Sequence, residues 1–435
     1  MKMNLWKSVC IAICAAGVFS GNAETGGEKE FPLLPASLRM PENSVTVIGP
    51  EGQFEVDGKP RYLMGVIFYE GTIRSIPYPA FGYPESLKWL YENLLDYEGT
   101  QRIGFDTVGM FTPTRWMSRY RKGHRVQEAP DQYRRPIDAG LPLYVDYTGA
   151  GWHHGGLNPK RDKTIPKEAF LRGLFMSYDM LHPVGRQFYL DMWRDGALVM
   201  KEHGAKPLWY ELFNEPGPTV LSAPGRAEFV RRMEKKYKNI EALNRVWGTE
   251  YTSFRQAGEF KRLADNPVLN IEWIKFTEDV FYELCREGIQ AIREIDPRPE
   301  AGFCIQPVTM RTKGINLYRI NTLMNRISSS TGGGNSVQAH FLRAMADGKP
   351  ISDGEMYTGS TRSGFRNAYL TQFARGFNAS FLFKWDKRSF DWVTKKKGPD
   401  GRTVFDVETS IAKAKKSAEK FPYNLLNPWA VPTES

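Results

Sequence analysis

The chain has 435 residues, of which 41% are apolar and 25% are charged, as in an ordinary soluble globular protein. This composition excludes a collagen-like chain, a disordered tail protein and a multi-span membrane protein. The formal net charge is +10, but the longest basic run is only Lys395–Lys397 and no nucleic-acid motif accompanies it, so we expect no nucleic-acid partner. Aromatic residues reach 13%, and their flat amphipathic rings are common surfaces for binding sugars.

Residues 1–23 have the pattern of a secretory signal peptide. Lys2 and Lys7 supply the positive charge at the start of the signal. Val9–Phe19 is an apolar run without charge, and Gly21–Ala23 offers small residues for cleavage. The run is about 11 residues long and therefore too short to span a bilayer, which needs about 20. An N-terminal anchor helix is the alternative. We expect a periplasmic or extracellular protein with no stable membrane insertion after cleavage.

Only Cys285 and Cys304 remain once the signal is removed. Two buried thiols are favoured, and a single disulfide is the alternative. The sequence has no CxxC, no HExxH and only 6 His, so we expect neither a metal site nor another cofactor.

Along the chain, residues 24–59 form a polar leader that includes a hairpin at Val45–Val56 with a turn signal at Asp57–Gly58. From residue 60 to 435 we expect one domain in which strands and helices alternate. The apolar runs predict strands at Tyr62–Tyr69, Phe105–Phe111, Leu141–Tyr147, Leu208–Phe213, Ala301–Ile305, Asn325–Ser329, Pro350–Glu355 and Ser380–Trp385. The helical patterns lie at Pro84–Gln101, Pro183–His203, Ala227–Trp247, Ile271–Ile295, Ser336–Ala346, Asn367–Phe377 and Thr409–Lys420.

Eight strands separated mostly by helices predict an α/β fold, a (β/α)8 TIM barrel. An open doubly wound sheet is the alternative fold. The absence of a GxGxxG turn after the first strand and of any P-loop argues against it. The polar stretch Thr112–Gly140 is too long for a plain connection and is predicted to be a functional loop.

Two glutamates stand where the catalytic groups of such a barrel lie, at the carboxyl ends of strands. Glu215 follows the fourth predicted strand, and Glu355 ends the seventh. Two carboxyl groups facing each other are what glycoside cleavage needs: one protonates the leaving oxygen, and the other attacks the sugar or activates water. A neighbouring negative charge raises the pKa of the proton donor.

Each glutamate has an ordinary alternative explanation. Asn214-Glu215-Pro216 also suits the start of a helix, because Asn is a good N-cap and Pro fits the first turn. Asp353 competes with Glu355, since residues two apart lie on the same side of a strand.

In addition, Trp385 ends the eighth predicted strand. The Asn214-Glu215 pair after the fourth strand, Glu355 at the seventh and Trp385 at the eighth together resemble a clan A glycoside hydrolase. The opening Phe54–Pro60 is similar to the first strand pair of such enzymes, and Tyr237–Thr249 is similar to a segment of family 42 β-galactosidases. The resemblance covers about residues 54–425.

The resemblance implies a retaining (β/α)8 enzyme with a role for each matching residue. Glu215 would be the general acid/base and Glu355 the nucleophile. Asn214 would hydrogen-bond the sugar 2-hydroxyl, and Trp385 would form the floor of a sugar subsite, with a core Trp as its alternative.

Trp152 and His153, in a Gly-rich loop after the third predicted strand, are further candidates for substrate contact, and loop packing is the alternative. We therefore expect a secreted retaining β-glycosidase that acts on an oligosaccharide or polysaccharide, with β-galactosidase-like specificity. The second hypothesis is a non-catalytic carbohydrate-binding barrel, which would have no use for the pair of carboxylates. The third is an exported structural or adhesive domain.

Overall fold

The computed structural model describes residues 40–41, 44–68, 105–111, 136–147, 166–170, 176, 178–218, 220–298, 302–306, 314–329, 336–357, 362–383, 394–397 and 403–406. The predicted signal peptide, most of the predicted loop Thr112–Gly140 and the helices predicted at Pro84–Gln101 and Thr409–Lys420 lie outside these ranges. Among the helices that the structure describes, none is long and apolar enough to cross a membrane.

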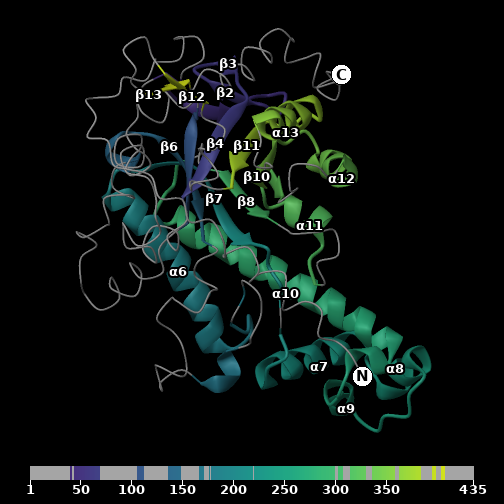
Figure 1. Cartoon of the computed structure of the whole chain (residues 1–435). Helices are drawn as coiled ribbons and strands as arrows, with labels where there is room; N and C mark the ends of the chain where they lie inside the picture. Colours follow the sequence, from purple (N-terminus) through teal and green to yellow (C-terminus); the bar gives the residue numbers. More distant parts are fainter. Residues whose placement is uncertain are drawn as a thin grey trace, which may run out of the picture.

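Eight strands form a parallel, nearly closed barrel in the centre of the molecule, which confirms the predicted fold (Figure 1). Their hydrogen-bonded order is β8-β7-β6-β5-β4-β11-β10-β9. The strands are β4 (Leu63–Phe68), β5 (Thr107–Phe111), β6 (Pro142–Asp146), β7 (Lys206–Asn214), β8 (Gly302–Gln306), β9 (Ile327–Ser329), β10 (Ile351–Met356) and β11 (Ala379–Leu382). Because parallel strands bury both faces, their sequences are apolar runs with little alternation.

Side chains join β8 to β9, the two end strands of that order. Asn325 accepts a hydrogen bond at Oδ1 from the Phe303 amide at 2.6 Å. Arg326, which directly precedes β9, has its Nη2 2.8 Å from Cys304 Sγ, and Ser328 Oγ of β9 lies 3.0 Å from Gln306 Oε1. We call this junction between β8 and β9 the seam.

The described helices follow the strands that they connect, and most pack on the outside of the barrel (Figure 1). They are α6 (Pro183–Glu202), α7 (Ala223–Tyr237), α8 (Ile240–Trp247), α9 (Phe254–Gly258), α10 (Pro267–Arg293), α11 (Leu317–Asn321), α12 (Ser336–Ala346) and α13 (Arg362–Ala374). Short 3-10 turns lie at Lys167–Ala169 and Leu263–Asp265, and a separate antiparallel pair is formed by β12 (Thr394–Lys397) and β13 (Thr403–Asp406).

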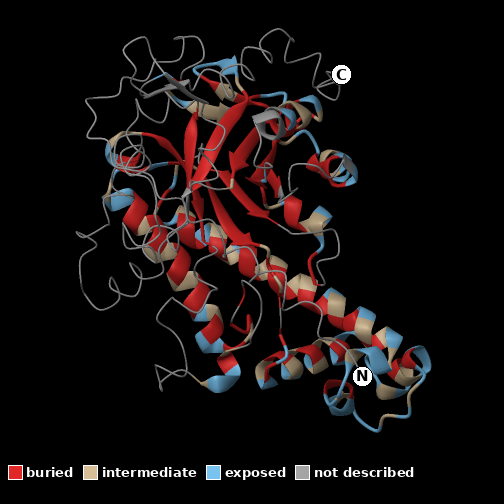
Figure 2. Ribbon diagram, viewed as in Figure 1, coloured by how far each residue is buried: buried red, intermediate tan, exposed pale blue. Residues whose placement is uncertain are grey.

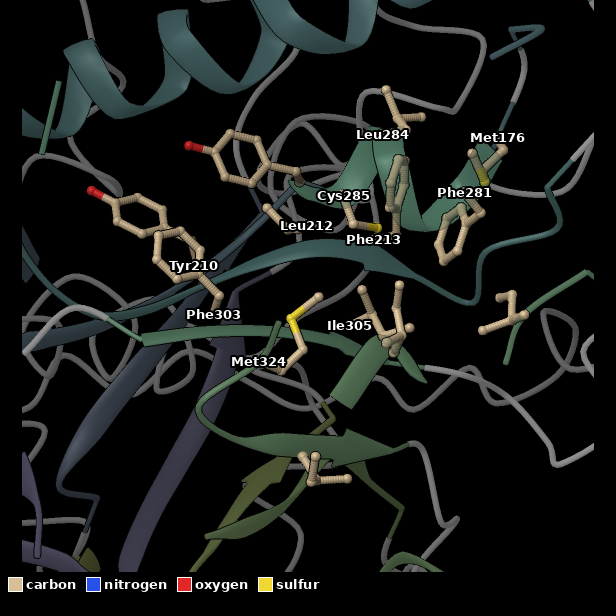
Figure 3. Packing of buried hydrophobic residues seen from close by; sticks show 14 of the residues in the cluster. Met176, Tyr210, Leu212, Phe213, Phe281, Leu284, Cys285, Phe303, Ile305 and Met324 are labelled. Carbon is tan, nitrogen blue, oxygen red and sulfur yellow. The ribbon is translucent and has the colours of Figure 1, made fainter. Parts of the chain in front are cut away.

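The larger hydrophobic cluster lies between the barrel wall and these helices (Figure 2). Figure 3 shows Leu212 and Phe213 of β7 close to Phe281 and Leu284 of α10. The rings of Phe213 and Phe281 are 5.4 Å apart. Cys285 is a buried free thiol in the same layer, and Cys304 is likewise free, so the two buried thiols favoured by the sequence are confirmed.

A second, smaller cluster fills the barrel interior and the end of the barrel where the strands begin. Trp209, Tyr144 and Phe381 point inward from three strands, with ring centroids about 5 Å apart, which suits edge-to-face packing. Phe54 stacks on Trp209 at 5.4 Å. Phe54 comes from a small antiparallel sheet of β1 (Thr46–Ile48), β2 (Phe54–Val56) and β3 (Lys59–Pro60). The predicted hairpin is therefore present, with one added strand, and it plugs the end of the barrel where the strands begin.

The helical region after β7 differs from the prediction in its boundaries. The helix expected at Ala227–Trp247 is two helices, α7 and α8, because Lys238 adopts a positive φ of 68° and Asn239 caps the next helix. Ser222, rather than Asn214, is the N-cap of α7. The first half of α10 lies against α7, α8 and α9, away from the sheet (Figure 1), and Phe229 packs on Trp273 at 4.7 Å.

The packing between α6 and the barrel predicts a large stability cost at Trp193, which is fully buried. Trp193→Ala leaves a cavity that the surrounding rings cannot fill, so we expect a loss of about 3–5 kcal/mol in the free energy of unfolding. The neighbouring Arg194→Ala removes only an exposed ion pair with Glu294 and should cost under about 1 kcal/mol. Urea denaturation of both variants measures the difference, and equal losses would contradict this account of the core.

Candidate functional site

The end of β7 turns Asn214 into the barrel. The register between β7 and β8 shifts between Glu211 and Asn214, so strict alternation of the side chains is interrupted there. Phe213 consequently packs outward against α10, whereas the Asn214 side chain is buried and contacts β10. No helix begins at Asn214, and the alternative explanation of this tripeptide as a helix start is wrong.

Glu215 follows directly in an unusual backbone conformation. Its φ is 46°, a region that residues with a side chain seldom occupy and that costs about 1–3 kcal/mol. The Glu215 amide donates a hydrogen bond of 2.6 Å to the backbone oxygen of Gln306, the last residue of β8. This bond fixes the backbone from which the half-buried Glu215 side chain extends.

Glu355 lies near the end of β10 and is 5% exposed. Its two carboxylate oxygens each accept a hydrogen bond of 2.8 Å: Oε1 from Asn214 Nδ2, and Oε2 from the Tyr357 hydroxyl. Hydrogen bonds donated to a carboxylate favour its charged form. The site therefore contains one carboxylate that is held by two donors.

Asp353, the competitor of Glu355, has a different position. It is fully buried, its Oδ2 accepts a hydrogen bond of 2.6 Å from Gln372 on α13, and its Oδ1 accepts one of 3.3 Å from the Glu355 amide. Its carboxylate thus ties β10 to the outer helix and holds the backbone of Glu355. The geometry favours Glu355, not Asp353, as the group that faces Asn214.

The two glutamates have unequal electrostatic surroundings. Burial raises the pKa of Glu215 to about 7, and the neighbouring charge of Glu355 adds to that shift. Burial, together with the same Glu355 charge, raises the pKa of Tyr357, which therefore keeps its proton and remains a donor. At neutral pH, Glu215 is close to half protonated, so this site can both give and take a proton.

Three residues of this arrangement were missed by the sequence analysis: Tyr357, Gln306 and Ser328. Tyr357 could have been found from its spacing, since it is two residues after Glu355 on an extended segment. Gln306 ends an apolar strand and donates from Nε2 to Asn214 Oδ1 at 3.1 Å. Ser328 donates to Gln306 in turn. A lone Gln or Ser at a strand end gives no distinctive signal in one sequence.

The structure brings together Asn214, Glu215 and Glu355 from the predicted site. The other predicted contacts, Trp385, Trp152 and His153, lie outside the described residues. Within the described ranges, no group of three or more His, Cys, Asp or Glu side chains could hold a metal ion.

Comparisons with known proteins relate the chain to glycoside hydrolases. The model of glycoside hydrolase family 42, described as beta-galactosidase, matches residues 197–331. That segment begins in α6 and ends just after β9, and it includes Asn214, Glu215 and Gln306. The chain is also 24% identical over 137 residues to the beta-galactosidase BglY of Alicyclobacillus acidocaldarius, which is 29% of this chain and 19% of that protein.

Solved structures share the fold over most of the chain. The family 42 exo-carrageenase from Bacteroides ovatus, solved without ligand, superposes with a TM-score of 0.59 at 16% identity, covering 91% of this chain and 57% of that one. The β-galactosidase from Bacillus circulans sp. alkalophilus gives a TM-score of 0.60 at 13% identity, covering 85% of this chain and 57% of the other. The chain thus resembles family 42 catalytic domains and spans little more than half the length of these two proteins.

The surroundings of Glu215 predict how its pKa responds to a change at its neighbour. Glu355→Gln removes a negative charge but leaves Glu215 buried, so the pKa of Glu215 should fall from about 7 yet stay above that of an ordinary Glu. Carboxyl carbon NMR of the two proteins, with the Glu215 signal identified by its loss in Glu215→Gln, measures this shift. A pKa unchanged by Glu355→Gln would show that the two groups do not interact.

Proposed function

We propose that the protein is a retaining β-glycosidase that hydrolyses β-galactoside-type bonds by double displacement. The observation that carries the proposal is the unequal pair at the carboxyl ends of β7 and β10: Glu215 with a pKa of about 7, and Glu355 held as a carboxylate by two donors. Such a pair supplies one acid and one nucleophile at neutral pH.

In the first step, a carboxylate oxygen of Glu355 attacks the anomeric carbon while the bond to the leaving oxygen breaks. Glu215 gives its proton to that oxygen, so the departing group leaves as a neutral alcohol. The product is a glycosyl ester on Glu355. Its formation neutralises the Glu355 charge, which lowers the pKa of Glu215 and prepares Glu215 to act as a base.

In the second step, Glu215 takes a proton from a water molecule, whose oxygen attacks the anomeric carbon. The ester bond to Glu355 breaks, and the carboxylate regains its hydrogen bonds from Asn214 and Tyr357. Two inversions give net retention. This mechanism requires carboxyl groups about 5 Å apart, and a separation beyond about 8 Å would indicate inversion instead.

Asn214 has a further role in this proposal. Its side-chain amide has two N–H groups, of which one donates to Glu355. The second has no hydrogen-bond partner among the described residues, and we propose that it donates to the sugar 2-hydroxyl, a contact that strengthens in the transition state. Trp385 as a subsite floor, and Trp152 and His153 as sugar contacts, complete the proposed substrate site.

The substrate class rests on the similarity to family 42 enzymes over residues 197–331, and galactoside-type oligosaccharides or polysaccharides fit it. The signal-peptide pattern at residues 1–23 supports action in the periplasm or outside the cell. A carbohydrate-binding barrel without catalysis is the competing function. It is disfavoured because the raised pKa of a half-buried Glu beside a second carboxylate costs stability without aiding binding.

The pKa of Glu215 predicts the alkaline side of the pH profile. The general acid works only when protonated, so kcat/KM should fall as the pH rises through about 7. Initial rates on an aryl β-galactoside across pH 5–9 measure this limb. An aryl group that leaves without protonation no longer needs the proton, so the decrease in kcat/KM above pH 7 should shift or flatten with such a substrate. A decrease that is the same for good and poor leaving groups would argue against Glu215 as the acid.

The two glutamates should respond differently to azide. Glu215→Ala should keep the first step on a substrate with a very acidic phenol, and added azide should then raise turnover and give the β-glycosyl azide. Glu355→Ala forms no ester, so any azide product should be the α anomer. We expect losses of at least about 10²–10⁴-fold without azide on substrates that need protonation.

Glu241→Ala, at an exposed position on α8, is the control for these substitutions and should keep normal turnover. Product anomers are assigned by NMR. Undiminished activity of both Glu215→Ala and Glu355→Ala on a good substrate would overturn the glycosidase proposal.

A further inference from the structure

We propose that Gln306 is a positioning residue that sets the orientation of both catalytic glutamates and of the Asn214 amide. The inference rests on the proposed glycosidase function and adds to it a residue that never touches the substrate. Gln306 is the last residue of β8, lies at the seam and is completely buried.

Three hydrogen bonds join Gln306 to described residues at or beside the site. Its backbone oxygen accepts the hydrogen bond from the Glu215 amide at 2.6 Å. Its Nε2 donates to Asn214 Oδ1 at 3.1 Å, and its Oε1 accepts from Ser328 Oγ at 3.0 Å. One residue thus holds the backbone of the proposed acid and, through Asn214, the carboxylate of the proposed nucleophile.

The direction of these bonds matters because an amide has one donating and one accepting end. The Glu355 carboxylate can only accept, so the NH₂ group of Asn214 must face it and the oxygen of Asn214 faces Gln306. The NH₂ group of Gln306 donates to that oxygen, and the oxygen of Gln306 accepts the hydrogen bond from Ser328. A reversed Asn214 would place a carbonyl oxygen against the Glu355 carboxylate and offer no donor to a sugar hydroxyl.

Gly354 on β10, the neighbour of β9, provides the space for this arrangement. A Cβ at Gly354 would lie 1.5 Å from Gln306 Oε1 and 2.9 Å from Ser328 Oγ. Gly354 does not have a positive φ, so the close approach of Gln306, and not a left-handed backbone, requires glycine at this position. Four adjacent strands, β7 to β10, therefore supply one continuous hydrogen-bonded row from Ser328 to Glu355.

The test compares substrates with and without a 2-hydroxyl. Gln306→Met keeps the length of the side chain but cannot donate to Asn214. Its kcat/KM should fall about 10- to 100-fold on an aryl β-galactoside, mainly in kcat, and much less on the matching 2-deoxygalactoside. The double variant Gln306→Met/Asn214→Ala should be no slower than Asn214→Ala alone, because both changes remove one interaction.

Gln53→Met is the matched control. Gln53 is also buried, at 4% exposure, but lies at the other end of the barrel, so its loss should leave the 2-hydroxyl dependence unchanged. Ser328→Ala is a milder change that removes the hydrogen bond to Gln306 Oε1, and Gly354→Ala pushes the Gln306 amide aside. Both should reproduce the Gln306→Met pattern in direction, and thermal unfolding shows whether each protein is folded.

Two results separate the inference from the function on which it rests. If the wild-type protein cleaves no glycoside, the proposed function fails. The side-chain amide NMR signal of Asn214, identified by its loss in Asn214→Ala, is then the readout, and an unchanged signal in Gln306→Met overturns the inference. If the wild type is active and Gln306→Met matches it, or adds its full loss to that of Asn214→Ala, the inference is likewise wrong.

Discussion

Two carboxyl groups in one partly dehydrated place cannot ionise equally, and this constraint organises the described site. Glu355 receives a hydrogen bond on each oxygen, whereas Glu215 is raised in pKa by burial and by the charge of Glu355. The difference is built from strand geometry. The shifted register of β7 turns Asn214 inward. The positive φ of Glu215 then directs the Glu215 side chain differently from that of Asn214. The unequal protonation is therefore a property of the barrel rim and not of either glutamate alone.

The barrel interior next to the site is not purely apolar, but its polar groups are compatible with the unequal protonation of Glu215 and Glu355. Arg326 is buried with its guanidinium 3.2 Å from the centre of the Trp209 ring and 2.8 Å from Cys304 Sγ. Burial raises the pKa of Glu211 well above the ordinary range, while the hydrogen bond from Tyr144 and the charge of Arg326 act in the opposite direction. The ring of Trp209 stabilises the buried cation of Arg326.

The sequence was sufficient for the features that depend on local pattern. Eight apolar runs predicted the eight strands, and counting them placed Glu215 and Glu355 at strand ends. It was insufficient where the result depends on one residue of register. Asn214 faces inward only because of the shift between β7 and β8, and Gln306 matters only because Gly354 leaves room on another strand. The same limit explains why one helix was predicted at Ala227–Trp247 where the structure has two. The break depends on the positive φ of Lys238, which composition does not reveal.

The small sheet that plugs the barrel where the strands begin has a consequence for how the chain folds as it is made. Phe54 stacks on Trp209, and a Cβ at Gly52 would lie 1.5 Å from the backbone oxygen of Gly348, so the first described sheet packs against residues far along the chain. Contacts of such long sequence separation form late, because the loop between them must first be closed. A ribosome that releases the chain from its N-terminus therefore exposes Phe54 and Val56 of β2 until the residues that bury them have emerged. These apolar side chains form a surface on which a chaperone can hold the growing chain before the barrel closes.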